Sequence, residues 1–211
     1  MKVVFIARSS LYRSKGGDTI QIQQTARYLE QLNTLVDIRL ANEKINYREY
    51  DLLHFFNLTR PSDILPHISR SKKPFVVTPL LIDYSEYDKQ YRKGLAGKIF
   101  SHLSSGQIEY AKTIVRWIKG QQSLQSFSYL FSGHTKSVKH IIKNAAIILP
   151  NSELEYRQLI QSYSLSPLFS IIPNGIDDNL FTVSVNEQKD KNMILCVARI
   201  EGLKNQINLI S

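Results

Sequence analysis

The fold class of this chain is decided by VVFIA at residues 3–7 and GGD at residues 16–18. The first stretch has the β-branched and aromatic residues typical of a strand. Asp18 then predicts a helix start, because its side chain can cap the first turn and Gln21 can reach back to the cap. A strand followed at once by a helix is the unit of α/β domains. The expected helix has one apolar stripe, made of Ile22, Ala26 and Leu29.

Five more apolar runs continue this pattern. They lack strict alternation, as do strands that helices cover on both faces of a parallel sheet. Ser152 and Glu155 form a second capping box directly after one run. We therefore expect a Rossmann-like, doubly wound α/β domain with a parallel sheet. The runs span residues 35–40, 52–56, 75–78, 146–149 and 169–172.

Residues 84–143 interrupt the alternation of strands and helices, and we expect them to be inserted helices. Between residues 89 and 143, ten Lys and Arg residues face one acid, Glu109, so this segment carries the formal net charge of +9. Such a charge attracts phosphate groups, whether of a membrane, a lipid diphosphate or a nucleic acid. The basic stretch around Trp117 could lie on an anionic membrane or form an ordinary helix with a solvated basic face.

The sequence also bears on location. It contains no apolar run of about 18 residues that could cross a bilayer, and its apolar start is too short for a signal peptide. A cytoplasmic protein is expected. Cys196 is the one cysteine of the chain, so it has no partner for an internal disulfide. It lies in an apolar run and is expected to be a buried core thiol.

Three later stretches form an ordered series with the glycine pair: ILPNS at 148–152, IIPNGID at 171–177 and ILCVARIEGLKN at 194–205. This series resembles the landmarks of the large retaining glycosyltransferase family with the two-domain GT-B fold (glycosyltransferase family 4). The resemblance implies an acceptor-binding domain over residues 1–186, with the insertion at 84–143. It also implies that residues 192–211 begin the donor-binding domain, with a strand from Met193.

The resemblance implies a chemistry as well. A hexose would pass, with retention, from a UDP- or GDP-linked donor to a cell-envelope glycan or a polyprenyl-diphosphate-linked acceptor, without a metal or other cofactor. The enzyme could attach peripherally to the inner face of the cytoplasmic membrane, and no nucleic-acid partner is expected.

Arg199 and Lys204 flank a short turn at a helix start, where two cations suit a diphosphate. In the family these positions hold the donor's pyrophosphate and stabilise the leaving nucleotide. Glycine in a loop lets backbone approach a ligand, although it also simply permits a turn. The expected substrate-binding residues are Gly16, Gly17, Asn151, Asn174 and Glu201.

The sequence departs from the family after the fourth expected strand. Family members commonly have a histidine there, whereas this chain has Asp83, which could orient an acceptor hydroxyl or cap a helix. We interpret His54, in an apolar strand, as a core histidine. Asn174 stands in a Pro-Asn-Gly sequence that favours a tight turn. The family's paired donor-site glutamates would follow Ser211, so this polypeptide alone is expected not to turn over.

Two other classes of function stay open. A nucleotide-sugar epimerase of the same fold would have many carboxylates and histidines in the cleft of its first domain, and the sequence does not suggest them. A nucleic-acid-binding module would use the basic insertion and would bind with steep salt dependence. The insertion has few aromatic residues for stacking on bases. Both alternatives are therefore weaker than the glycosyltransferase.

Overall fold

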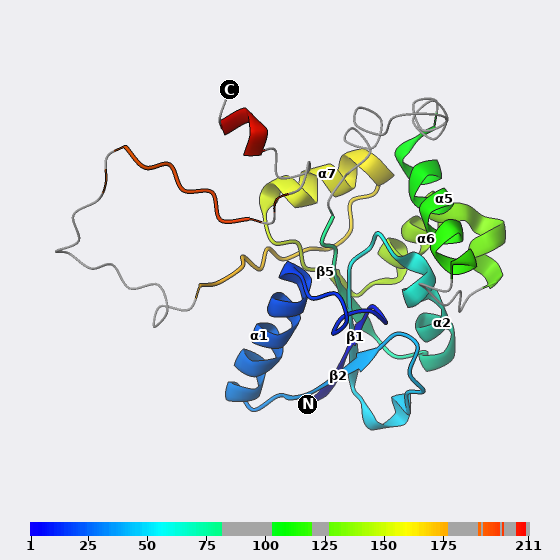
Figure 1. Ribbon diagram of the computed structural model, residues 1–211. Helices are drawn as coiled ribbons and strands as arrows, with labels where there is room; N and C mark the ends of the chain where they lie inside the picture. Colours follow the sequence, from blue (N-terminus) through cyan, green and yellow to red (C-terminus); the bar gives the residue numbers. More distant parts are fainter. Residues whose placement is uncertain are drawn as a thin grey trace. The chain divides into compact units, whose positions relative to one another are not determined.

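The computed structural model of the 211-residue chain describes residues 1–81, 103–119, 127–176, 190, 192–198, 200 and 206–209. The chain divides into two compact units, Met1–Asn174 and Gly175–Ser211. The first unit holds a five-stranded sheet with helices packed on it (Figure 1). All four strand pairings are parallel, in the order β2-β1-β3-β4-β5. The strands are β1 (Lys2–Ala7), β2 (Leu35–Leu40), β3 (Leu52–Phe56), β4 (Phe75–Thr78) and β5 (Ile147–Ile148).

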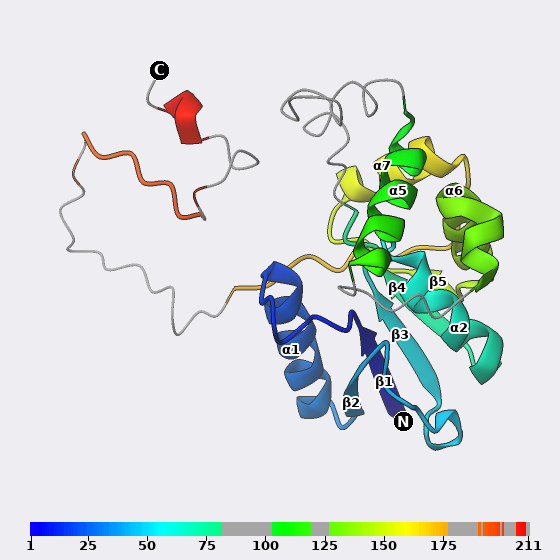
Figure 2. The same ribbon diagram turned by 45° about the vertical axis from the view of Figure 1, so that its right-hand side comes forward.

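Helices cover both faces of the sheet, so the predicted doubly wound α/β architecture is confirmed. Helix α1 lies on one face, and α2 and α6 lie on the other (Figure 2). The longer helices are α1 (Gly17–Gln31), α2 (Pro61–Ser71), α5 (Ser105–Ile118), α6 (Phe127–Asn144) and α7 (Glu153–Tyr163). Two short 3-10 helices are η1 (Tyr47–Glu49) and η3 (Gln206–Leu209), the latter in the second unit. No helix in the described ranges has the length and apolar character needed to cross a membrane.

Strand β1 shows why its sequence lacks strict alternation. Successive side chains of a strand point to opposite faces, and here both faces are buried. Val4 and Ile6 enter the core formed with α2, α6 and α7, whereas Val3 and Phe5 enter the core beneath α1. Full burial of such a side chain stabilises the fold by about 1.5–3 kcal/mol. The sheet is therefore packed on both faces, and this packing holds the ends of its strands in place.

The insertion after β4 is helical in its described parts, as expected. Ser104 caps α5: its hydroxyl accepts a hydrogen bond from the Gln107 amide (3.4 Å), and the Gln107 side chain accepts one from the Ser104 amide (2.9 Å). Gly133, with φ of 72°, interrupts α6. This left-handed conformation favours glycine, and it allows the helix to change direction.

The strand expected at residues 169–172 is reduced to one parallel bridge between Ile148 and Phe169. Backbone hydrogen bonds from Ile148 to Leu168 and from Ser170 to Ile148 extend the contact. The segment lies at the sheet edge beyond β5, and both Leu168 and Phe169 are exposed. Burial is thus too small here to hold a longer strand.

The strand expected from Met193 does not form, and this prediction is wrong for the described residues. Residues 193–197 have no regular structure, and Met193 and Val197 are exposed. Cys196 is also exposed, so it is not a buried core thiol. A strand needs neighbouring strands and a packed face, and the described part of the second unit offers neither.

Candidate functional site

The strand order marks one edge of the sheet as a candidate ligand site. The chain winds from β1 to β2 on one side and then to β3 on the other. In open α/β sheets, ligands bind outside the carboxyl ends of the strands at such a switch in winding. Arg8 directly follows β1, and Arg60 ends the short loop that follows β3. The loops at this edge therefore define the candidate site.

Arg8 organises the loop between β1 and α1. Its guanidinium donates two hydrogen bonds to the Asp18 carboxylate, from Nε to Oδ2 (2.6 Å) and from Nη2 to Oδ1 (3.1 Å). It also donates to the Ser10 hydroxyl (2.8 Å) and the Ser14 carbonyl (2.6 Å). A bidentate pair of this kind fixes geometry as well as charge. Arg8 therefore fixes the conformation of the loop between β1 and α1.

Asp18 is not the helix cap that the sequence suggested. Gly16 occupies the cap position, and its amide donates to the Thr19 hydroxyl (3.2 Å). Partial burial acts to raise the pKa of the Asp18 carboxyl, but the hydrogen bonds and charge of Arg8 outweigh it. The net pKa of Asp18 lies below its usual value, so the carboxylate is ionised at neutral pH and paired with Arg8.

The glycine pair opens the start of α1 to a ligand. The first amides of a helix have no acceptor within the helix, so the Gly17 amide can donate to a bound group. A side chain on Gly16 would crowd Asp18, since its Cβ would lie 3.1 Å from Oδ1. A Cβ on Gly17 would meet open space. A ligand can therefore approach the start of α1 at Gly17.

Asn151 lies close to this helix start. Its side-chain oxygen accepts a hydrogen bond from the Gln21 side chain of α1 (2.7 Å). Gln21 therefore does not complete a capping box, as the sequence suggested, because it binds a loop 130 residues away in sequence. The structure thus brings Gly16, Gly17 and Asn151 together at one edge of the sheet.

Glu155 joins the ends of two strands. Its amide donates to the Ser152 hydroxyl (3.2 Å), which confirms half of the predicted capping box. Its carboxylate instead accepts from the amides of Asn151 (2.6 Å) and Leu81 (2.7 Å). Leu80, beside Leu81, has a left-handed backbone with φ of 47°. One buried carboxylate therefore fixes the loop after β5 against the chain that leaves β4.

His54 is a core residue, as expected. Its Nε2 lies 2.8 Å from the Thr78 hydroxyl, and its ring stacks on Phe56 with 4.2 Å between centroids. Burial lowers the pKa of His54 to about 3. The ring is therefore neutral at physiological pH and supports the sheet below the site.

The other predicted site residues are Asn174 and four residues outside the described ranges. Asn174 is exposed at the end of the first unit. Asp83, Arg199, Glu201 and Lys204 lie outside the described residues. Sequence reasoning missed Arg8 and Arg60 at the switch in winding. The sequence did offer a signal for each: Arg8 directly follows an expected strand, and Arg60 directly precedes Pro61, which starts a helix.

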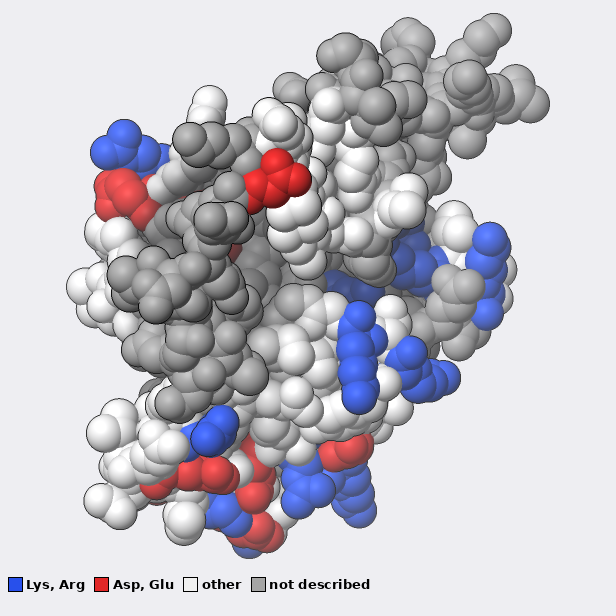
Figure 3. Space-filling view, turned by 60° about the vertical axis from the view of Figure 1, so that its left-hand side comes forward, with Lys and Arg blue, Asp and Glu red and all other residues white. Residues whose placement is uncertain are grey.

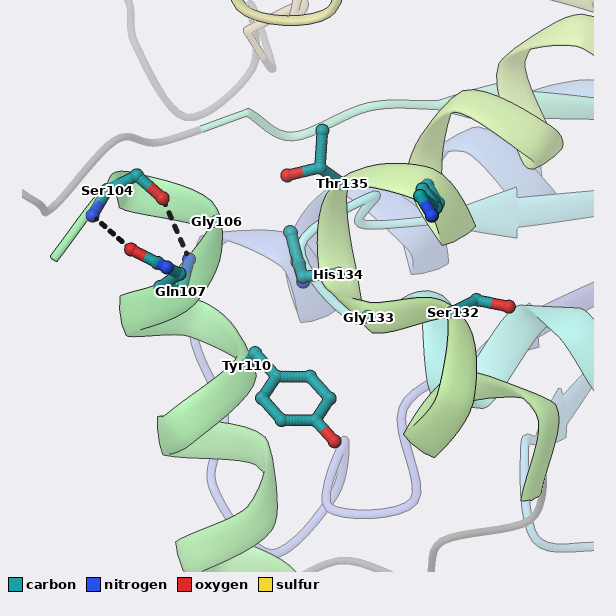
Figure 4. Close-up of a pocket in the computed structure, with 9 residues that line it drawn as sticks. Ser104, Gly106, Gln107, Tyr110, Ser132, Gly133, His134 and Thr135 are labelled. Atoms are coloured by element: carbon teal, nitrogen blue, oxygen red, sulfur yellow. Dashed lines mark hydrogen bonds between the residues drawn. The ribbon is translucent and has the colours of Figure 1, made fainter.

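A pocket of about 300 Å³ lies away from this edge, between α5 and α6 (Figure 4). Gly106 lets the helices approach closely, because a Cβ there would lie 2.3 Å from the Thr135 hydroxyl. Burial lowers the pKa of His134 to about 4, so its ring is neutral. Of the described residues that line the pocket, Lys136 alone is then charged. The pocket is a polar gap within the insertion, and we assign the candidate site to the sheet edge.

The chain matches no protein-family model and no curated protein sequence. Several solved chains resemble it, including two structures with bound UDP. Both are crystal structures of HepE from Anabaena. One contains UDP, with 17% identity and a TM-score of 0.46, and the other contains UDP and glucose, with 16% identity and a TM-score of 0.47.

The matches to HepE cover 85% and 88% of this chain, but only 46% and 47% of the HepE chain. This chain therefore spans about half the length of HepE.

Proposed function

We propose that this chain is the acceptor-binding part of a nucleotide-sugar-dependent glycosyltransferase, and that residues 192–211 begin its donor-binding domain. One observation carries the proposal: the Gln21–Asn151 hydrogen bond joins the first turns of α1, the helix that the glycine pair begins, to the ILPNS stretch. Open parallel sheets bind ligands outside the carboxyl ends of their strands. Two stretches that resemble family landmarks thus contribute to one site.

The donor is a UDP- or GDP-linked hexose. The Gly17 amide, at the start of α1, can donate to its diphosphate. Arg199 and Lys204 supply two positive charges to the same diphosphate and stabilise the nucleotide as it leaves. Asn174 and Glu201 contribute to sugar binding. The reaction retains the configuration of the sugar and needs no metal ion, because the two cations neutralise the leaving group.

The acceptor is a cell-envelope glycan or a lipid-linked sugar. Asp83 follows β4 in sequence, and it orients the acceptor hydroxyl for attack.

The enzyme works at an anionic membrane surface. Trp117 and Ile118 at the end of α5 and Phe131 of α6 are exposed apolar side chains on the basic insertion. Figure 3 shows one face on which basic side chains gather on one side apart from acidic ones, whereas the two mix at the lower end. Exposed aromatic and basic side chains together favour binding to anionic lipid.

The test uses a longer protein that carries both domains, supplied with UDP- and GDP-linked hexoses. Arg199→Ala and Lys204→Ala are each expected to reduce sugar transfer by about 100-fold or more, because each removes charge from the leaving group. Arg157→Ala is the control, since Arg157 is exposed and pairs with Glu153 on α7. Transfer undiminished in both test variants refutes the proposed role.

A further inference from the structure

Two arginines beside the candidate site have no hydrogen-bonding side chain or ion-pair partner among the described residues. Arg60 precedes Pro61 at the start of α2, and Arg116 lies in the last turn of α5. Both side chains are partly buried. Within the described ranges, no hydrogen bond or ion pair engages either guanidinium. Buried or partly buried charges are normally paired, so this arrangement calls for an explanation.

The two guanidiniums are near each other. Figures 1 and 2 both place the end of α5 beside the start of α2. Burial lowers the pKa of Arg60, and the positive charges of Arg116 and Arg8 lower it further. Asp63 and Asp18 act in the opposite direction. Asp18 is already bound by Arg8. Among the described residues, three guanidiniums therefore act at this end of the sheet with two carboxylates.

The arrangement is electrostatically incomplete. Like charges repel more strongly when they are partly removed from water. An anion between Arg60 and Arg116 would relieve that repulsion. Guanidinium groups bind phosphate oxygens in pairs and lose little solvation in doing so. The position is also suitable, because Arg60 follows β3 at the switch in winding, where ligands reach the sheet edge.

We infer that Arg60 and Arg116 bind a phosphate group of the acceptor. Naming the acceptor rests on the proposed function, which assigns the donor diphosphate to Gly17, Arg199 and Lys204. The acceptor is then a phosphate-bearing molecule such as a lipid diphosphate, held by one arginine from α2 and one from the insertion. The insertion thus contributes a residue to the site.

The experiment titrates the 211-residue chain with geranyl diphosphate, geraniol and inorganic diphosphate in a calorimeter. Geranyl diphosphate is expected to bind, and Arg60→Gln and Arg116→Gln are each expected to weaken its binding roughly 10- to 100-fold. Arg157→Gln, at an exposed position of α7, is the matched control and should bind as the parent does. Circular dichroism checks that each variant folds, and Arg116→Gln keeps the test open if Arg60→Gln does not fold.

The arms identify the source of the phosphate. Geranyl diphosphate that binds at least ten-fold more tightly than inorganic diphosphate supports a lipid headgroup, and equal binding supports recognition of phosphate itself. Geraniol that binds equally well, or affinities unchanged in both variants, overturns the inference. This titration and the transfer assay can fail independently. Unchanged binding in Arg60→Gln and Arg116→Gln says nothing about the role of Arg199 and Lys204. Undiminished transfer in Arg199→Ala and Lys204→Ala leaves the phosphate binding by Arg60 and Arg116 unaffected.

Discussion

Gln21 of α1 donates a hydrogen bond of 2.7 Å to Asn151, which follows β5. This bond fixes the start of α1 against the loop after β5. Gln21→Ala is expected to lower the free energy of unfolding by about 1 kcal/mol and to weaken donor binding in the two-domain protein. Gln23→Ala is the control, because Gln23 is exposed on the same helix. Urea unfolding and UDP titration measure the two effects, and identical behaviour of the two variants contradicts the positioning role.

Asp18→Asn removes the charge that Arg8 binds. The pair is partly exposed, so solvent screening limits the expected loss of stability to about 1–2 kcal/mol. The pKa of Asp18 is lowered in the folded protein, so its contribution is present above the unfolded pKa and is lost as pH falls through the folded pKa.

The difference between the parent and Asp18→Asn should therefore be constant from pH 7 to pH 5 and shrink below about pH 4. Urea unfolding at several pH values measures it. A difference that grows as the pH falls would show that the carboxylate is not stabilised by Arg8.

His54→Gln tests the buried neutral histidine. The pKa of His54 is about 3 in the folded protein, below its ordinary value of 6.5. Its contribution to stability is therefore fully present above pH 6.5 and is lost as the pH falls from there toward 3. Each such histidine adds a slope that approaches about 1.4 kcal/mol per pH unit below pH 6.5. His67 and His134, with pKa values of about 4, add to this slope.

His54→Gln is expected to reduce the loss of stability between pH 6 and pH 4.5 by one such contribution. Phe56→Leu is the control, because it weakens the same aromatic stack without removing a titrating group. The slope of unfolding free energy against pH is the measurement. An unchanged slope in His54→Gln contradicts a neutral core histidine.

Gly17→Ala separates folding from ligand approach. A Cβ on Gly17 meets open space, so stability should be unchanged or rise by up to about 1 kcal/mol. The added methyl group would occupy the space in front of the helix start and weaken donor binding in the two-domain protein. Gly16→Ala is the comparison, because its Cβ would crowd Asp18 and should lower stability by about 1 kcal/mol. Full binding by Gly17→Ala excludes the ligand from this position.

Apolar runs predicted the sheet well, because burial on both faces leaves its mark on each strand separately. Strand β1 and its helix α1 were found from local sequence alone. The caps were less predictable: Asp18 and Gln21 have the residue types of a capping box, but Arg8 and Asn151 bind them first. Short-range patterns do not show such partners, which the fold brings close from a distance in sequence.

The candidate site was predicted only where a motif identified it. Gly16, Gly17 and Asn151 belong to stretches with a recognisable pattern, and the structure brings them together. Arg60 and Arg116 carry no motif. Their significance lies in their surroundings, because no described residue forms an ion pair with either guanidinium, and this is a property of tertiary structure. The strand expected from Met193 had the right composition, but composition alone cannot supply a neighbouring strand.

The carboxylate of Glu155 holds the amide of Leu81, where the chain leaves the sheet for the insertion, and that of Asn151, just after it has returned. The two ends of the inserted segment are thus tied at their base by a residue that does not belong to it. Within that segment α6 is constrained, because Val138, Ile141 and Ile142 pack in the core of the sheet. The part that precedes α6 can vary in length and sequence with less effect on the sheet. A protein built this way can exchange the outer part of its insertion as a cassette while the scaffold stays the same.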